Sequence, residues 1–358
     1  MKGATAQIDI NALQHNLSVV RSYIPATTRV VGVVKANAYG HGLIPVAKAL
    51  TSVDAYAVAR LEEALALRSS GIVKPIILLE GFFSDEDLPV LAANHLQTAV
   101  HTWEQLRALE AMDLPHPVQV WMKLDTGMHR LGIQAEETEA FIQRLSHCKN
   151  VVQPFNFITH FSCADDMNNS KTTQQIELFN QIVQKHSGEK TLASSAGILA
   201  WQDAHADWVR PGIMIYGGSP FEDKTGLDLN LKPVMTVKTT LLAVRTLKKG
   251  ESVGYSATWT TERETKIGVV AIGYGDGYPR MAPAGVPVLL NGRIVPVVGR
   301  VSMDMMTVDL GPDAQDKVGD DVTLWGDGLP VEIVAKAIGT IPYELLTKLT
   351  PRVIMEYK

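Results

Sequence analysis

Six polar residues stand at or just after the ends of apolar runs, and their types suit amine, acid-base and anion-binding chemistry. They are Lys35, Lys123, Arg130, His160, Ser195 and Arg210. A lone lysine after an apolar strand is usually a solvated cap. Burial and cationic neighbours can instead lower the pKa of a lysine, and its free amine then serves as a nucleophile. Six such residues in equivalent positions favour one shared site over six separate caps.

Two short segments could hold a phosphate group. Ser195 follows one apolar run, and Gly212 and Ile213 follow Arg210 after the next. Either segment alone is typical of an ordinary glycine-containing turn, but together they offer hydroxyl and backbone N–H donors for an anion. An amine such as that of Lys35, placed across from a phosphate site, is the arrangement that pyridoxal phosphate requires, because its aldehyde and phosphate leave the ring on different sides.

The elements that must position these residues are eight apolar runs separated by helical patterns. The runs cover residues 29–35, 54–60, 75–81, 96–101, 118–125, 155–161, 190–195 and 207–212, with helical patterns at 61–68, 103–112 and 171–185. Repeated alternation of this kind, with continuously apolar strands, predicts an α/β fold whose first part, residues 1–229, is a (β/α)8 TIM-type barrel. The carboxyl ends of parallel barrel strands meet at one rim, which would bring the six polar residues together.

A change of pattern near residue 230 predicts a second domain. Long β-branched stretches cover residues 234–246, 266–272, 286–290, 294–298 and 306–310. Asn291-Gly292 between two of them indicates a tight hairpin. Helices are expected at residues 330–338 and 343–349, so residues 230–358 are predicted to form a mainly β C-terminal domain.

Composition excludes several classes of partner. The 358 residues include 33 Lys and Arg and 38 Asp and Glu, a net charge of −5, and the positive charges form no stripe that would indicate nucleic acid binding. Apolar runs are too short for a membrane span, and the first residues do not resemble a signal peptide. The two cysteines, Cys148 and Cys163, lack metal-ligand spacing, so we expect a cytoplasmic protein without a metal that acts on a small molecule.

A series of motifs resembles the pyridoxal-phosphate-dependent alanine racemases of bacteria. The motifs are VVKANAYGHG, WMKLDTGMHRLG, THFSCAD, WVRPGIMIYG, VGYSATW, GYGDGYPR, GRVSMDM and IPYELL, in order from Lys35 to Tyr343. The first motif alone also occurs in relatives that only bind the cofactor, whereas the whole set is specific. The resemblance implies interconversion of L-alanine and D-alanine, either to supply D-alanine for peptidoglycan or to degrade it.

The resemblance implies two proton carriers on opposite faces of the cofactor aldimine. Lys35 would be the Schiff-base lysine and would act on D-alanine, while Tyr255 would act on L-alanine. Racemisation requires this arrangement, because one group removes the α-proton on one side and another returns a proton on the other. Tyrosine, with an ordinary pKa of about 10, is a poor base unless positive charge or hydrogen bonds favour its phenolate. In the family a pair matching His160 and Arg210 lies near that tyrosine.

Arg210 would also face the pyridine nitrogen of the cofactor. Arginine cannot readily give up a proton, so the ring is a weaker electron sink than it would be beside an acid. A short-lived carbanion suits racemisation better than transamination or decarboxylation. By the same resemblance, Arg130 and the backbone of Met303 would contact the substrate carboxylate, and Lys123 matches a lysine that some members carry as a carbamate.

The remaining implied residues hold the phosphate, narrow the entrance or join two subunits. Phosphate would be held by Tyr39, Ser195, the amides of Gly212 and Ile213, and Tyr343. Tyr274 and Asp304 would narrow the entrance, and in a homodimer Tyr255, Met303 and Asp304 would complete the site of the other subunit. The chain departs from the family pattern at Ser256, where glycine is frequent, and at Ser302, where cysteine is common in some branches.

Three alternative functions remain open at this point. A cofactor carrier would share the barrel and the Lys35 motif but lack the β domain and Tyr255. A barrel decarboxylase would have an acidic residue in place of Arg210. A Schiff-base aldolase without cofactor would show no visible absorbance.

Overall fold

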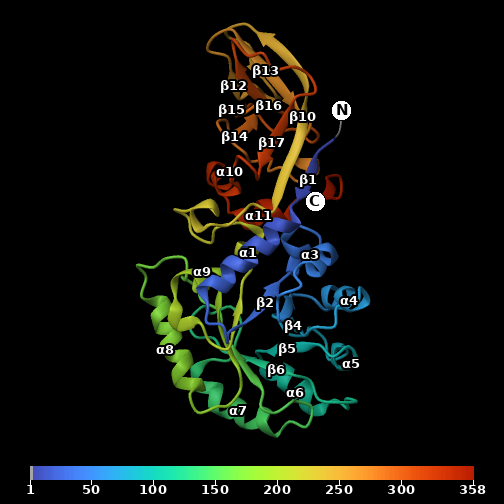
Figure 1. The fold of residues 1–358 in the computed structure, drawn as a ribbon, viewed down its shortest axis with the longest axis vertical. Coiled ribbons are helices and arrows are strands. Elements are labelled where there is room, and N and C mark those ends of the chain that lie inside the picture. The colour runs from blue at the N-terminus through green and yellow to red at the C-terminus, as the bar shows by residue number, and fades with distance from the viewer. Residues whose placement is uncertain (1–2) are drawn as a thin grey trace. The chain divides into compact units, whose positions relative to one another are not determined.

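The chain divides into two structural units that interleave along the sequence. The computed structural model describes residues 3–358. One unit comprises Leu17–Ala38 and Gly42–Ile215 and contains the barrel, and the other comprises the chain as far as Asn16, Tyr39–His41 and Tyr216–Lys358 and contains most of the β structure (Figure 1). We refer to them as the barrel unit and the β unit.

Eight parallel strands close into a barrel, as the sequence predicted. They are β2 (Arg29–Val33), β3 (Ala55–Val58), β4 (Ile76–Leu78), β5 (Gln97–Val100), β6 (Val120–Lys123), β7 (Asn156–Ile158), β8 (Lys190–Ser194) and β9 (Trp208–Arg210). The barrel closes where Arg29 of β2 pairs with Trp208 of β9. Each predicted run contains one strand, but the strands are shorter, and β2 ends two residues before Lys35.

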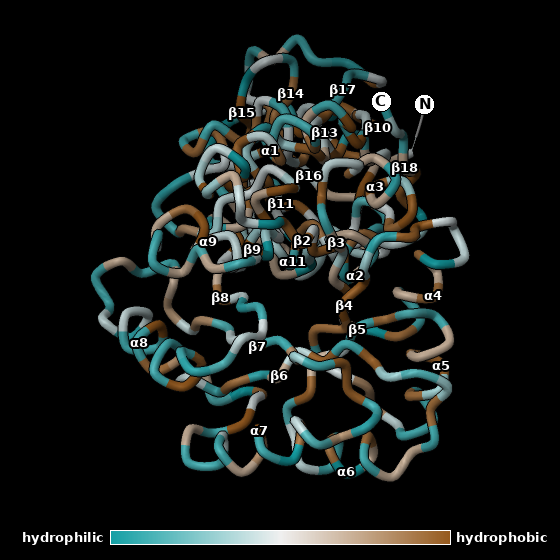
Figure 2. The backbone as a smooth tube through the Cα atoms, turned by 60° about the horizontal axis from the view of Figure 1, so that its bottom comes forward, coloured by the Kyte–Doolittle hydropathy of each residue, from teal (hydrophilic) through white to brown (hydrophobic). Residues whose placement is uncertain are grey.

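The helices of the barrel unit lie between these strands in sequence. They are α3 (Leu43–Ala49), α4 (Leu61–Ser69), α5 (Asp87–Ala93), α6 (Trp103–Ala111), α7 (Thr138–His147), α8 (Lys171–Val183) and α9 (Ser195–Ala200), with short 3₁₀ turns η1 (Ala135–Glu137) and η2 (Gln202–Ala204). Most residues of these strands are buried, as expected for parallel strands covered by helices, and the wholly apolar β4 is brown in Figure 2. Residues at the strand ends are therefore held by a packed scaffold.

The β unit is built on an eight-stranded sheet. Its order is β13 (Thr265–Val270), β16 (Met306–Gly311), β15 (Arg293–Val298), β14 (Pro287–Leu290), β17 (Asp321–Trp325), β10 (Met235–Leu247), β1 (Thr5–Ile8) and β18 (Ile354–Tyr357). β13 also pairs with β10. The predicted hairpin is confirmed, because Leu290 pairs with Arg293 across Asn291 and Gly292, both of which have positive φ.

Helix α1 (Ile10–Tyr23) begins in the β unit and ends in the barrel unit. The 3₁₀ turn η3 (Ile213–Tyr216) begins in the barrel unit and ends in the β unit. The shorter elements of the β unit are the strand pair β11 (Ser252–Val253) and β12 (Trp259–Thr260), helices α10 (Val331–Ile338) and α11 (Pro342–Thr347), and 3₁₀ turns η4 (Leu227–Leu229), η5 (Tyr255–Ala257) and η6 (Tyr274–Asp276). Across residues 3–358, no helix is both long enough and apolar enough to cross a membrane.

The N-terminal strand departs from the sequence interpretation, which placed residues 1–229 in the barrel. Strand β1 instead pairs antiparallel with β10 and parallel with β18, and residues 216–229 also cluster with the β unit. The pattern Thr-Ala-Gln-Ile is equally compatible with either sheet. Only the long-range partners, more than 200 residues away, decide where the strand pairs.

We predict that the barrel depends strongly on Phe157, which lies on β7 and is 1% exposed. Phe157→Ala should lower the free energy of unfolding by about 3–5 kcal/mol, because the deletion leaves a cavity in a closely packed interior. Urea denaturation followed by circular dichroism measures this change. Phe83→Ala is the matched control, since Phe83 is 68% exposed, and equal losses in both variants would contradict the packing argument.

Candidate active site

Lys35 opens a backbone turn of unusual handedness. It begins α2 (Lys35–Tyr39), two residues after the end of β2, and Ala36, Asn37 and Ala38 all have φ and ψ between 44° and 55°. This is left-handed helical geometry, which L-residues other than glycine seldom adopt in succession. Strained backbone of this kind persists only where surrounding contacts hold it, and it is concentrated at functional sites.

The barrel unit gathers positive charge around Lys35. Burial lowers the pKa of the Lys35 amine, the Glu80 carboxylate opposes that shift, and the charge of Arg130 adds to it. Lys123, the last residue of β6, is only 7% exposed. Its pKa is lowered to about 8 by burial and by the charges of Arg210 and Arg130. Both amines therefore lose their protons more easily than ordinary lysines, which is a requirement for amine nucleophiles.

Arg210, the last residue of β9, is buried among neutral acceptors. Its guanidinium donates to the Thr191 hydroxyl at 2.7 Å and to the carbonyl oxygens of Thr159 at 2.7 Å and Leu192 at 3.1 Å. These bonds involve both terminal nitrogens of the guanidinium but bring no negative charge to it. Arginine keeps its proton in proteins, so this charge is fixed at the site.

His160 contacts the same guanidinium. Its Nδ1 lies 3.5 Å from a terminal nitrogen of Arg210. Burial, and next the charge of Arg210, lower the pKa of His160 to about 3. The imidazole is therefore neutral at physiological pH, and Nδ1 is able to accept a hydrogen bond from the arginine.

Ser195 brings together the segments that the sequence interpretation assigned to phosphate. It begins α9 directly after β8, and its Oγ accepts hydrogen bonds from the amide of Gly212 at 3.0 Å and that of Met214 at 3.4 Å. Ser195 and Ile213 are both buried. The hydroxyl proton of Ser195 is not used in these two bonds, so the segment retains donor capacity for an anion.

Two further tyrosines of the predicted phosphate group lie close to each other within the β unit. The rings of Tyr39 and Tyr343 are 6.1 Å apart, and Tyr39 stacks on Tyr216 at 4.7 Å. Burial raises the pKa of Tyr39 to about 12, so its hydroxyl remains a donor at neutral pH. The stacking fixes the ring of Tyr39. Sequence reasoning did not foresee this contact, because Tyr216 lies in the motif WVRPGIMIYG but was assigned no role there.

The residues predicted to act from the β unit lie on its surface. Tyr255 is 69% exposed and begins η5. The next residue, Ser256, has φ 63°, in the left-handed region that glycine adopts readily, which agrees with the expectation from sequence that glycine suits this position. Tyr255 is therefore held by a short, tightly turned segment and is available to groups outside its own unit.

Backbone hydrogen bonds join the loop of Tyr274 to the loop that carries Met303 and Asp304. The amide of Tyr274 donates to the Ser302 carbonyl at 3.0 Å, and that of Gly275 to the Met303 carbonyl at 2.8 Å. Arg352, which sequence reasoning missed, pairs with Asp304 at 2.9 Å and with Asp276 at 3.1 Å. In the sequence, the position of Arg352 shortly after the motif IPYELL was the only indication that it contributes to the site.

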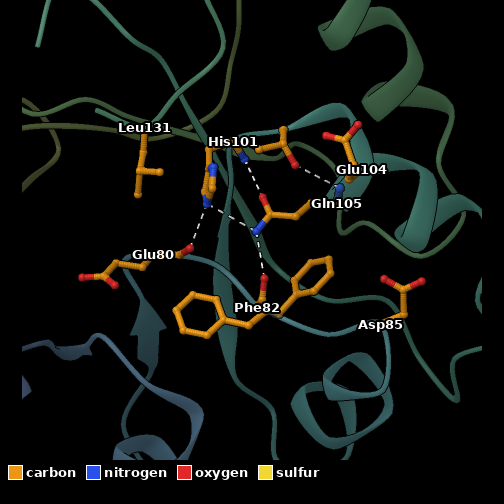
Figure 3. Close-up of a pocket in the computed structure, with 9 residues that line it drawn as sticks. Glu80, Phe82, Asp85, His101, Glu104, Gln105 and Leu131 are labelled. Carbon is orange, nitrogen blue, oxygen red and sulfur yellow. Dashed lines mark hydrogen bonds between the residues drawn. The ribbon is translucent and has the colours of Figure 1, made fainter. Parts of the chain in front are cut away.

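A cavity of about 390 Å³ lies at the ends of β4 and β5, and Figure 3 shows the residues that line it. It is lined by Glu80, Phe82, Phe83, Asp85, His101, Thr102, Glu104, Gln105 and Leu131. None of the predicted site residues lines this cavity. One lining residue, Glu80, is linked to the predicted site because its charge raises the pKa of Lys35. The Glu80 carbonyl oxygen lies 2.8 Å from Nε2 of His101. Glu80 was missed from sequence, although it ends a predicted strand like the six residues first considered. Within residues 3–358, no group of His, Cys, Asp and Glu could hold a metal ion.

The fold and this cluster define the class: a (β/α)8 barrel enzyme with an amine and fixed positive charges at the carboxyl ends of its strands, joined to a β unit. The family model for the alanine racemase N-terminal domain matches residues 8–220, and that for the C-terminal domain matches residues 234–357. The chain belongs to the alanine racemase family.

Individual relatives match the chain over its full length. It is 66% identical over 357 residues to the alanine racemase of Aeromonas hydrophila, covering 100% of both, and 60% identical to that of Vibrio vulnificus, covering 100% of the chain and 99% of the relative. The crystal structure of the biosynthetic alanine racemase from Pseudomonas aeruginosa is similar with a TM-score of 0.97, at 44% identity and 100% coverage of both chains. The crystal structure of an alanine racemase from Bacillus anthracis with bound L-Ala-P is similar with a TM-score of 0.88, at 32% identity, covering 100% of this chain and 95% of that one.

We predict that the His160 imidazole stays neutral from pH 8 down to about pH 5, because burial and Arg210 disfavour its charged form. Imidazole resonances followed by NMR, assigned with a His160→Asn variant, should show no titration in this range. In urea the same histidine should titrate near 6.5. The unfolded chain then binds the extra proton, so the contribution of His160 to stability falls as the pH drops below about 6.5. Titration of the folded-state resonance near 6.5 would contradict this assignment.

Proposed function

We infer that this protein is an isomerase that interconverts L-alanine and D-alanine. The observation that carries the inference is the match at 66% identity over the full length of a curated alanine racemase, together with the basic cluster at the barrel rim. The similar Bacillus anthracis alanine racemase has L-Ala-P bound, which supports an alanine-sized substrate.

Pyridoxal phosphate is the cofactor that we propose, and the residues fit it. Lys35 supplies an amine whose pKa is lowered, and Ser195 with the Gly212 and Ile213 segment supplies donors for a phosphate. Tyr39 and Tyr343 would add their hydroxyls. The surrounding positive charge favours an anionic ligand. When bound, the cofactor supplies a conjugated ring that accepts the electron pair left by the departing α-proton.

Two side chains would move the α-proton. The Lys35 amine would take or return it on one face, and Tyr255 of the partner subunit would do so on the other. The exposure of Tyr255 on its own unit supports a role in the site of a second copy, as does the exposure of Met303. We therefore propose a homodimer in which Met303 and Asp304 also act in trans, with Tyr274 and Asp304 narrowing the entrance.

The arginines would orient the reacting groups. Arg210 would face the pyridine nitrogen of the cofactor. Its hydrogen bonds go to neutral acceptors, which supports a site where no acidic side chain protonates that nitrogen. His160 would hold that guanidinium in place. Arg130 would bind the substrate carboxylate, since a guanidinium matches a carboxylate in two parallel hydrogen bonds. Lys123, with its lowered pKa, could combine with carbon dioxide, releasing a proton, to form a carbamate that pairs with Arg130.

The alternatives considered from sequence have less support. A decarboxylase would need an acid where Arg210 stands, and a carrier would not need the β unit. We also propose a cytoplasmic location, because Cys148 and Cys163 are both free thiols, as expected in a reducing compartment.

We predict that the purified protein racemises L-alanine faster than L-serine or L-lysine and shows the visible absorbance of lysine-bound pyridoxal phosphate. Chiral chromatography of the three incubated amino acids measures both reaction and preference. Lys35→Ala should abolish the band and the activity, whereas Lys48→Ala, on the exposed surface of α3, should change neither. Racemisation by the Lys35→Ala variant at the normal rate would refute the assignment.

We predict that Tyr255→Phe keeps the absorbance band but slows exchange of the α-proton of L-alanine with solvent deuterium by about 10²- to 10⁴-fold, the usual contribution of a positioned acid or base. NMR of L-alanine in deuterium oxide measures this exchange. Tyr23→Phe, on α1 and outside the predicted site, is the control. Normal exchange in Tyr255→Phe would rule out the two-base mechanism.

A further inference from the structure

The left-handed turn after Lys35 needs contacts that hold it. Ala36, Asn37 and Ala38 all lie in the left-handed region, and each has a Cβ that this geometry disfavours. The turn follows the proposed cofactor lysine directly, so its geometry sets the direction in which the Lys35 side chain leaves the backbone. Whatever stabilises the first residue of the turn therefore also positions the amine.

Hydrogen bonds within the barrel unit hold the turn. The Ala38 amide donates to the Val34 carbonyl at 2.8 Å, the Asn37 carbonyl accepts from the Gly42 amide at 3.0 Å, and the Asn37 side-chain oxygen accepts from the Leu43 amide at 2.8 Å. A further bond, the shortest of these, runs from the Ala36 amide to Oε1 of Glu63, at 2.6 Å. It alone among them joins the turn to another βα segment and has a charged acceptor, which strengthens a hydrogen bond.

Glu63 is itself fixed by backbone donors. Its second oxygen, Oε2, accepts from the amide of Ala59 at 2.9 Å and from that of Arg60 at 3.1 Å, at the start of α4. A carboxylate in the first turn of a helix satisfies unpaired amides and is stabilised by the helix dipole. One carboxylate thus joins the end of β2 to the end of β3.

Glu63 also supplies charge to the site. Together with Glu80 it opposes the effect of burial and of Arg130 on the pKa of Lys35. Glu62, the preceding residue, lies exposed in the same helical turn. The two glutamates therefore differ in contact with the turn but not in charge.

We propose that Glu63 is a positioning residue for Lys35: its carboxylate clamps the first amide of the left-handed turn and so places the lysine amine for the cofactor. This inference rests on the proposed function of Lys35. Its test compares Glu63→Ala and Glu63→Gln with Glu62→Gln in the full-length protein.

The cofactor-free protein gives the first readout. Hydrogen exchange followed by mass spectrometry on a peptide covering residues 34–43 should be about tenfold faster or more in Glu63→Ala, because the amide loses a bond to a charged acceptor. Glu63→Gln keeps one acceptor oxygen and should fall between, and Glu62→Gln should match the wild type. If Glu63→Ala does not fold, Glu63→Gln carries the comparison, and exchange equal to that of Glu62→Gln overturns the proposal.

The second readout is the dissociation constant of pyridoxal phosphate, with a rescue experiment. Glu63→Ala should weaken cofactor binding about tenfold or more, and adding Ala36→Gly should recover part of it, because glycine adopts the left-handed conformation readily. A role limited to capping α4 would lower thermal stability without rescue by Ala36→Gly, and that result would also overturn the proposal. Absence of Lys35-bound cofactor in the wild type would instead refute the proposed function, while the exchange experiment still tests the clamp.

Discussion

Positive charge concentrated at a buried rim of the barrel constrains the rest of this structure. Lys35, Lys123 and Arg210 are enclosed with Arg130 nearby, and the pKa of each lysine is lowered as a result. Burying like charges is costly unless they are neutralised, paired or matched by a ligand of opposite charge. A cofactor phosphate and a substrate carboxylate would meet that need. The same cost keeps the lysine amines easily deprotonated, as Schiff-base chemistry requires.

The barrel holds the charge of Arg210 with neutral hydrogen-bond acceptors, which do not neutralise it. Arg210 is held by carbonyl oxygens and a threonine hydroxyl, so it keeps both its position and its charge. His160 next to it stays neutral and completes the contact. Two carboxylates act on Lys35: Glu63 lies in the first turn of α4, which follows β3, and Glu80 lies just after the neighbouring strand β4. The strand ends of the closed barrel thus set the distances on which the electrostatics depend.

The β unit contributes surface residues whose positions are fixed by local turns. Ser256 in the left-handed region holds the segment of Tyr255, and Arg352 ties the loop of Asp304 to that of Asp276. Rigid loops suit side chains that contribute to a site in a second subunit, because such loops lose less conformational entropy when the subunits associate. The exposure of Tyr255 and Met303 is consistent with the proposed sharing of sites between subunits.

The sequence by itself determined the barrel and the β-rich second part, because apolar periodicity is a local property. The residues of the proposed site came from the order of its motifs and their resemblance to a family, and they remain a prediction. It also located the Asn291-Gly292 hairpin from turn chemistry alone. Only the tertiary structure decided that β1 joins the sheet of the β unit, that the residues after Lys35 turn left-handed, and that Glu63 holds that turn. Those features depend on hydrogen bonds between distant segments, and Ala36 and Ala38 are residue types that give no local indication of a positive φ.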